Sequence, residues 1–230
     1  MAARVKPRSP TQHVATAAAM AKYSGEVAAD SSHPGFWLRV VAFLIDTVVQ
    51  VIADQYQAEP GNYLAFFSSF DYQRQASERL AERHPEVPQF AQSRGMSEAD
   101  RQAFVERFTP HSQGVGFAVL GGAFGEGIDL PGARLIGAFI ATLGLPQVNP
   151  VNERMRERLQ ALLGDGWRYT YLYPGLQKVV QAAGRVIRSE EDRGVVWLLD
   201  DRFARSEVRR LLPPWWHVET MAGCAAPESA

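Results

Sequence analysis

The segment QAAGRVIRSEEDRGVVWLLDDRF, residues 181–203, places a glutamine and two arginines directly before an apolar strand. Gln181, Arg185 and Arg188 fall at i, i+4 and i+7, so on a helix they would share one face. Arginine keeps its charge and offers a planar fork of donors, which suits it to binding a phosphoryl group during transfer. The segment therefore predicts a phosphate site. The alternative is a solvated helix end with salt bridges to the acidic residues at 190–192.

Two blocks upstream also combine an apolar strand with a polar end. FAVLGGAFGEGIDLPG, residues 117–132, begins apolar and then breaks into five glycines mixed with acidic residues. GNYLAFFSSFDY, residues 61–72, is a second apolar strand that ends in Ser68 and Ser69. Glycine lets a backbone approach a ligand closely, so the block at residues 117–132 is a candidate ligand-binding strand end.

Length and composition indicate one main globular domain. The chain has 230 residues, of which 46% are hydrophobic and 21% charged, as is ordinary for a soluble protein. Its formal net charge of −1 gives no global attraction to nucleic acid, so any such site must be a local basic patch. The single cysteine, Cys224, excludes a disulfide framework and a four-cysteine metal or iron–sulfur site in this chain, and it fits a cytoplasmic setting. The histidines lack ligand spacing, so no metal site is expected.

The middle of the chain alternates short apolar strands with helices, which predicts an α/β fold with a parallel sheet covered on both faces. Ser97 and Asp100 form a capping box, so a helix is expected to begin there. A second helix is expected from Asn149 to about Gly164. The expected strands are 63–67, 88–92, 115–120, 135–142 and 195–199.

The N-terminal part differs from this pattern. Residues 1–33 are alanine-rich but interrupted by polar residues, so we expect a poorly ordered extension and not a secretory signal. Residues 34–56 predict an amphipathic helix that leads into the domain. Within it, residues 36–46 resemble the opening of the RDD family of membrane proteins. Arg39 and Asp46 interrupt that run, and a charge near a bilayer centre costs about 2.5 to 3.5 kcal/mol. No stable membrane association is therefore expected.

The three strand-and-loop blocks, in this order and spacing, resemble motifs IV, V and VI of superfamily 2 helicases of the DinG and XPD type. The resemblance covers residues 48–217, and YLYPGLQKVVQAAGRVIRSEEDRGVVWLLDDRF is similar to that family's second motor domain. It implies an α/β, RecA-like fold of the P-loop NTPase kind, with a parallel sheet and helices on both faces. Residues 57–218 would be the second motor domain only. Residues 219–230 are expected to be a disordered tail.

The resemblance also implies roles for individual residues. In this family ATP lies in the cleft between two motor domains, and Gln181, Arg185 and Arg188 would face its γ-phosphate, with both arginines acting as fingers from across the cleft. The nucleotide would be lined, or coupled to DNA, by Glu126, Gly127, Asp129 and Gly184.

Nucleic-acid contacts are implied for two serines. Ser68 and Ser69 would hydrogen-bond the backbone of single-stranded DNA, which positions the strand without reading its sequence. The alternative for both is a cap between a strand and a helix. The neighbouring tryptophans Trp215 and Trp216 could stack on bases, but packing against the domain is the preferred interpretation.

Two elements of a complete motor are missing from the sequence. It contains no G-x-x-x-x-G-K-[ST] loop and no Asp-Glu pair of the kind that holds magnesium. ATP and Mg²⁺ would therefore be bound mainly by a first motor domain, in the same chain or on another one. We expect the 230-residue chain alone not to hydrolyse ATP. The alternative function is a non-catalytic remnant or a module that binds DNA or a partner protein.

Overall fold

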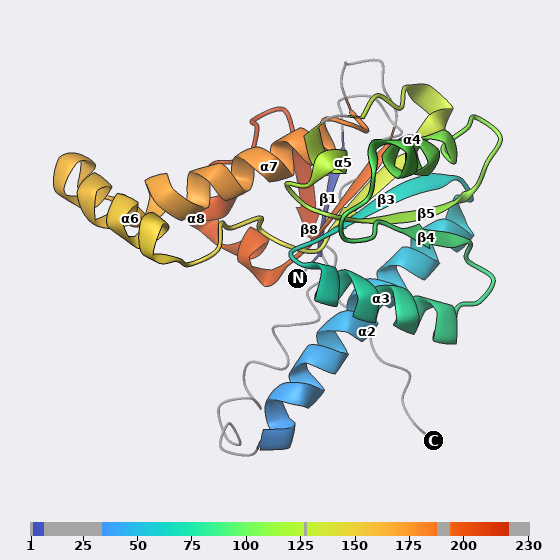
Figure 1. The fold of residues 1–230 in the computed structure, drawn as a ribbon, viewed down its shortest axis with the longest axis horizontal. Helices are drawn as coiled ribbons and strands as arrows, with labels where there is room; N and C mark the ends of the chain where they lie inside the picture. The colour runs from blue at the N-terminus through green and yellow to red at the C-terminus, as the bar shows by residue number, and fades with distance from the viewer. Residues whose placement is uncertain (1, 7–33, 127, 188–193, 221–230) are drawn as a thin grey trace.

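The fold is built on a seven-stranded sheet (Figure 1). The structure is a computed structural model that describes residues 2–6, 34–126, 128–187 and 194–220. The strand order is β4-β5-β3-β6-β7-β1-β8, and the five strands from β4 to β7 in that order run parallel. This confirms the predicted parallel α/β sheet. The strands are β1 (Ala2–Lys6), β3 (Asn62–Phe67), β4 (Gln89–Ala91), β5 (Gly114–Val119), β6 (Gly137–Ile140), β7 (Val195–Leu199) and β8 (His217–Thr220).

Helices cover both faces of the sheet. The helices α2 and α3 lie on one face, whereas α4, α5, α7 and α8 belong to the other (Figure 1). The helix α6 projects away from the body (Figure 1). The α-helices are α2 (Pro34–Ala58), α3 (Phe70–Arg83), α4 (Glu98–Glu106), α5 (Ala123–Glu126), α6 (Pro150–Leu163), α7 (Tyr173–Ala183) and α8 (Ser206–Arg209). Shorter turns are the 3-10 helices η1 (Gly132–Arg134) and η3 (Asp201–Ala204) and the π-helix η2 (Arg168–Leu172).

Alternation along the central strand β3 divides the core in two. Tyr63 and Phe67 pack on the α2 and α3 side, and Leu64 and Phe66 pack on the α7 side. All six residues of β3 are buried, which is typical of a parallel strand with helices on both faces. The central strand is thereby held between two apolar layers, and its carboxyl end is set at one edge of the sheet.

The helix α2 is part of the core as well as an approach to it. Its C-terminal half is buried against the sheet, with Ile52 0% exposed. A buried chain of hydrogen bonds also joins it to two strands. The indole N–H of Trp197 donates to Gln55 Oε1 over 3.1 Å, and the Gln55 amide donates to the Tyr63 hydroxyl over 3.2 Å. Tyr63 in turn donates to the carbonyl of Glu59 over 2.6 Å. The side chains of Trp197, Gln55 and Tyr63 thus all have hydrogen-bond partners in this network.

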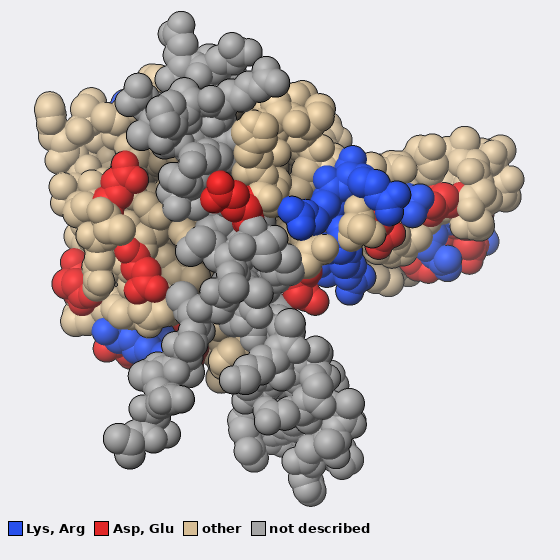
Figure 2. Space-filling view, turned by 180° about the vertical axis from the view of Figure 1, so that it is seen from behind, with Lys and Arg blue, Asp and Glu red and all other residues tan. Residues whose placement is uncertain are grey.

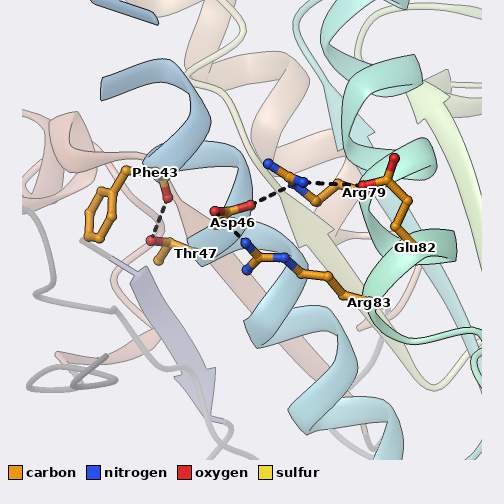
Figure 3. A network of polar contacts seen from close by, with 6 residues as sticks. All are labelled: Phe43, Asp46, Thr47, Arg79, Glu82 and Arg83. Atoms are coloured by element: carbon orange, nitrogen blue, oxygen red, sulfur yellow. Dashed lines mark hydrogen bonds and ion pairs between the residues drawn. The ribbon is translucent and has the colours of Figure 1, made fainter. Parts of the chain in front are cut away.

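An ion-pair network fastens α2 to α3 (Figure 3). Asp46 of α2 lies 2.9 Å from Arg79 Nε and 2.9 Å from Arg83 Nη2. The Arg83 contact is a hydrogen bond, whereas the Arg79 contact is a charge contact without hydrogen-bond alignment. Arg79 also pairs with Glu82 one turn further along α3. Asp46, one of the two charges that argue against membrane insertion of this helix, thus pairs with arginines of α3.

Residues 2–6 differ from the prediction of a poorly ordered extension over residues 1–33. They form β1, which pairs antiparallel with β7 and with β8. The pairings join residues about two hundred positions apart, so no local sequence pattern predicts them. The strand β8 likewise extends to Thr220, beyond the predicted domain end at 218. The rest of the two predicted disordered segments lies outside the described residues. Among the described helices, none is long and apolar enough to span a bilayer.

Candidate functional site

The helix α7 carries Gln181 but ends before the arginines. Its last helical residue is Ala183, and Gly184 caps it with φ −64° and ψ −6°. Arg185 therefore lies in the turn directly after the helix and not within it. Glycine is a poor helix former, and Val186, 5% exposed, turns into the core beside β7. Arg188 lies outside the described residues.

Arg185 joins the end of α7 to the loop at residues 120–132, which we call the glycine-rich loop. Its Nη1 donates to the carbonyl of Ile128 over 3.1 Å, and its Nε donates to the carbonyl of Gly125 over 3.4 Å. The two contacts span about sixty positions of sequence and join the block at residues 117–132 to the block at residues 181–203. A guanidinium suits this junction because its fork of N–H donors reaches two carbonyls at once.

The glycine-rich loop begins at the carboxyl end of β5. Gly121 adopts φ +78°, a left-handed conformation that side chains rarely accept. The short helix α5 follows, and the buried Ile128 and Leu130 hold the loop to the core while Asp129 is exposed. Gly127 and the side chain of Glu126 lie outside the described residues. Of the four residues predicted to line the nucleotide, the structure thus places two: Asp129 is exposed in this loop, and Gly184 is half-buried at the end of α7.

Gln181 opens onto a groove along α7. The side chain is half-buried, and the groove has a volume of about 310 Å³. Close packing at the start of α7 sets the position of this helix, because a Cβ on Gly175 would lie 2.7 Å from the carbonyl oxygen of Leu143. The groove is lined by Tyr173, Leu176, Gln177, Val180, Gln181 and Leu211.

Lys178 is a functional candidate that sequence reasoning missed. Its side chain lies against Gly121, where an added Cβ would be 3.3 Å from the ammonium nitrogen. The residue is half-buried, and within the described part of the chain it has no ion-pair partner. A signal was available, since Lys178 precedes Gln181 by three positions and so lies near it on the same side of the helix. The lysine adds a positive charge beside the glycine-rich loop.

Ser68 and Ser69 are exposed at the carboxyl end of β3. The Ser69 hydroxyl accepts a hydrogen bond from the backbone N–H of Tyr72 over 3.2 Å and so caps α3. The capping alternative therefore holds for Ser69, whereas the structure assigns no such role to Ser68. Arg94 lies close by, 4.9 Å from the ring centre of Phe70.

Parallel strands end at the same edge of a sheet, so these elements share one edge. The strands β3 and β5 are neighbours with Phe67 opposite Val119, which places Ser68 beside the start of the glycine-rich loop. The exposed Ser68 hydroxyl and the Lys178 ammonium beside Gly121 lie at this edge. Across the described residues no group of three or more His, Cys, Asp or Glu side chains could hold a metal ion.

Comparisons with known proteins identify the family. The family model for the helicase C-terminal domain matches residues 52–219. Regulator of telomere elongation helicase 1 of Bos taurus is 30% identical over 74% of this chain and 16% of its own length. ATP-dependent helicase DinG of Mycobacterium tuberculosis is 29% identical over 72% of this chain and 24% of its own length. The chain thus spans less than a quarter of these relatives.

A solved structure of XPD without ligand supports the same fold. It superposes with a TM-score of 0.61 at 20% identity, over 78% of this chain and 35% of that one. The parallel five-stranded core and its flanking helices account for this likeness. The chain belongs to the helicase C-terminal domain family, and it is similar to DinG helicases in sequence and to XPD in fold.

Proposed function

We propose that this chain is the second motor domain of an ATP-dependent DNA helicase and supplies one wall of the ATP site. The observation that carries the proposal is the bridge from Arg185 to the carbonyls of Gly125 and Ile128. It joins two blocks that the family resemblance assigns to nucleotide contact and to coupling. A change at one block can therefore be transmitted to the other through a single side chain.

The residues at the end of α7 fit the γ-phosphate side of a nucleotide. Gln181 offers an amide at an open groove, and Lys178 places a positive charge beside the glycine-rich loop. Arg185 and Arg188 would stabilise the negative charge of the transferring phosphoryl group. ATP bound there supplies the phosphoryl group whose transfer drives movement. Contacts to the nucleotide, or its coupling to DNA, would fall to Glu126, Gly127, Asp129 and Gly184.

The described residues do not fit a complete ATP site. A phosphate loop is missing from the sequence, and the described acidic residues form no cluster suited to Mg²⁺. Most contacts to ATP and Mg²⁺ would therefore come from a first motor domain. That domain is the principal protein partner we propose.

Single-stranded DNA would cross the sheet edge at Ser68 and Ser69. The Ser68 hydroxyl is exposed and can donate to a phosphate oxygen. The Ser69 hydroxyl caps α3, so a phosphate beside Ser69 would lie at the amino end of that helix. Contacts of this kind do not read bases, so binding should be independent of sequence.

A second candidate function has one observation in its favour. The helix α6 exposes apolar side chains, among them Val151 at 72% and Leu162 at 69%, and such a surface favours association with another protein. A module that binds DNA or a partner without any role in hydrolysis would use the same surfaces.

The two functions separate in a fusion experiment. The first motor domain of mycobacterial DinG is joined to this chain, and ATP turnover is measured with and without single-stranded DNA. The proposal predicts DNA-stimulated turnover well above that of the first domain alone. A fusion in which both domains are folded by circular dichroism, yet which turns over no faster than the first domain, would contradict it and favour the binding module.

A further inference from the structure

The segment around α8 carries three exposed arginines that have no carboxylate partner among the described residues. Arg209 donates to the carbonyl of Val218 over 3.2 Å. Arg210 donates to the carbonyl of Ser206 over 3.1 Å, and Arg205 makes no side-chain contact of this kind. Backbone carbonyls orient a guanidinium but leave its charge uncompensated. We call Arg205, Arg209 and Arg210 the α8 patch.

The neighbouring arginines behave differently. Arg202 is held by Asp200 at 2.6 Å, and Arg168 pairs with Asp165 and with Glu207. The carboxylate inside α8 is thus already engaged by another arginine. Asp201 lies close in sequence, but among the described residues it forms no ion pair with the α8 patch. The view in Figure 2 shows lysine and arginine side chains gathered where the α6 arm leaves the body, the part of the fold that holds α8 in Figure 1.

An exposed tryptophan follows the α8 patch. Pro213 and Pro214 restrict the backbone, and the N–H of Trp216 donates to the carbonyl of Pro213 over 2.9 Å. Trp216 packs against the core on the α7 face, whereas Trp215 is 68% exposed. The preferred sequence interpretation, packing of both rings, therefore holds for Trp216 alone. Trp215 is presented on a fixed turn with its ring in solvent.

We propose that the α8 patch and Trp215 form a second binding surface for single-stranded nucleic acid. The arginines would contact phosphates and the indole ring would stack on a base. Charge on a groove or ridge combined with an exposed aromatic ring is the usual composition of such surfaces. The formal net charge of −1 strengthens the argument, because attraction must come from a local patch.

This surface is distinct from the proposed Ser68 and Ser69 contact. Those serines follow the carboxyl end of β3, whereas the α8 patch follows the carboxyl end of β7, which lies two strands away in the same sheet. The serines offer hydroxyl groups and contribute no charge, so they hardly affect the salt dependence of binding. The arginines release counterions on binding and set that dependence. The two surfaces can therefore be separated by one titration series.

The test measures binding of a fluorescent oligothymidylate of about 20 nucleotides across a salt series. Replacing Arg209 and Arg210 together by glutamine should lower the salt slope by about 1 to 2 and weaken binding at low salt by about tenfold. The charge-matched control replaces Arg101 and Arg107, which are exposed at α4, by glutamine and should leave both values unchanged. Ser68→Ala should leave the slope unchanged.

The ring is tested separately. Trp215→Leu should weaken binding about fivefold or more without changing the salt slope, and Trp215→Phe should restore most of the loss because a ring remains for stacking. Equal losses for the α8 and α4 double variants would overturn the proposal, since net charge alone would then explain binding. Full affinity in Trp215→Leu, or no binding by the unaltered chain, would also overturn it. Unfolding curves confirm that each variant is folded.

Discussion

The helices α2 and α6 are both amphipathic, yet the molecule uses them in opposite ways. In α2 the apolar side is buried under the sheet from Ile45 to Tyr56, and polar contacts fasten it further. In α6 no residue is buried, and Leu162 remains 69% exposed. The family model begins at residue 52, so most of α2 lies outside the match and all of α6 lies inside it.

The difference shows that the region matched by the family model and the region buried in the core do not coincide. The family match includes α6 although none of its residues is buried, so the match does not follow burial. Stability follows buried apolar area, which α2 supplies on both sides of residue 52, where the family match begins. We therefore expect changes in α2 to act on folding and changes near α6 to α8 to act on binding.

The largest expected effect on stability is at Ile52, which is fully buried in α2. Ile52→Ala should lower the free energy of unfolding by about 2 to 5 kcal/mol, because it removes buried methylene groups and leaves a cavity. The matched change Leu162→Ala in α6 should stay within about 0.5 kcal/mol. Urea unfolding followed by circular dichroism measures both. Equal destabilisation by the two changes would break the comparison.

A smaller effect is expected at the buried hydrogen-bond chain. Gln55→Leu leaves the indole N–H of Trp197 without its acceptor and should cost about 1 to 3 kcal/mol in the free energy of unfolding. Gln50→Leu is the control on the same helix, because Gln50 bonds only to the exposed Asp54. The same urea titration compares them. If Gln50→Leu lowered the free energy of unfolding as much as Gln55→Leu, burial of a side chain in α2 would not decide how much that side chain contributes to stability.

The smallest effect concerns the base of α6 and its dependence on pH. The hydrogen bond from the Tyr171 hydroxyl, followed by that from Arg156, holds the pKa of Glu153 below its ordinary value of 4.5. A lowered pKa means that the carboxylate stabilises the fold at neutral pH and that this contribution is lost as the pH falls through the folded-state value.

Glu153→Gln should therefore reduce the loss of stability on acidification, and the two proteins should converge in acid. Melting temperatures from about pH 7 to about pH 3 measure it. A variant with an unchanged acid profile would show that this anchor contributes nothing.

Much of the fold could be predicted from local sequence. The capping box at Ser97 and the left-handed cap at Gly164 both occur as expected, and strand β7 has the predicted bounds 195–199. These features depend on neighbouring residues alone, which is why a sequence pattern reveals them.

Other features depend on distant contacts and could not be predicted. The helix α7 ends where Val186 turns into the core, and Arg185, in the turn after it, binds the glycine-rich loop. The strand β1 depends on pairing with β7 and β8. Arg188 and Gly127, outside the described residues, remain predictions from sequence.

The most direct test of the central claim measures ATP turnover by the fusion with a first motor domain after Arg185→Lys and Arg188→Lys. Lysine keeps the charge but lacks the planar fork, so we predict that each change lowers turnover by about 10³-fold or more. The Michaelis constant for ATP and the melting temperature should change little by comparison. Near-normal turnover in both variants would contradict the account. Unfolding by either change would also contradict it, because the loss of turnover would then follow from loss of the fold and not from loss of a finger.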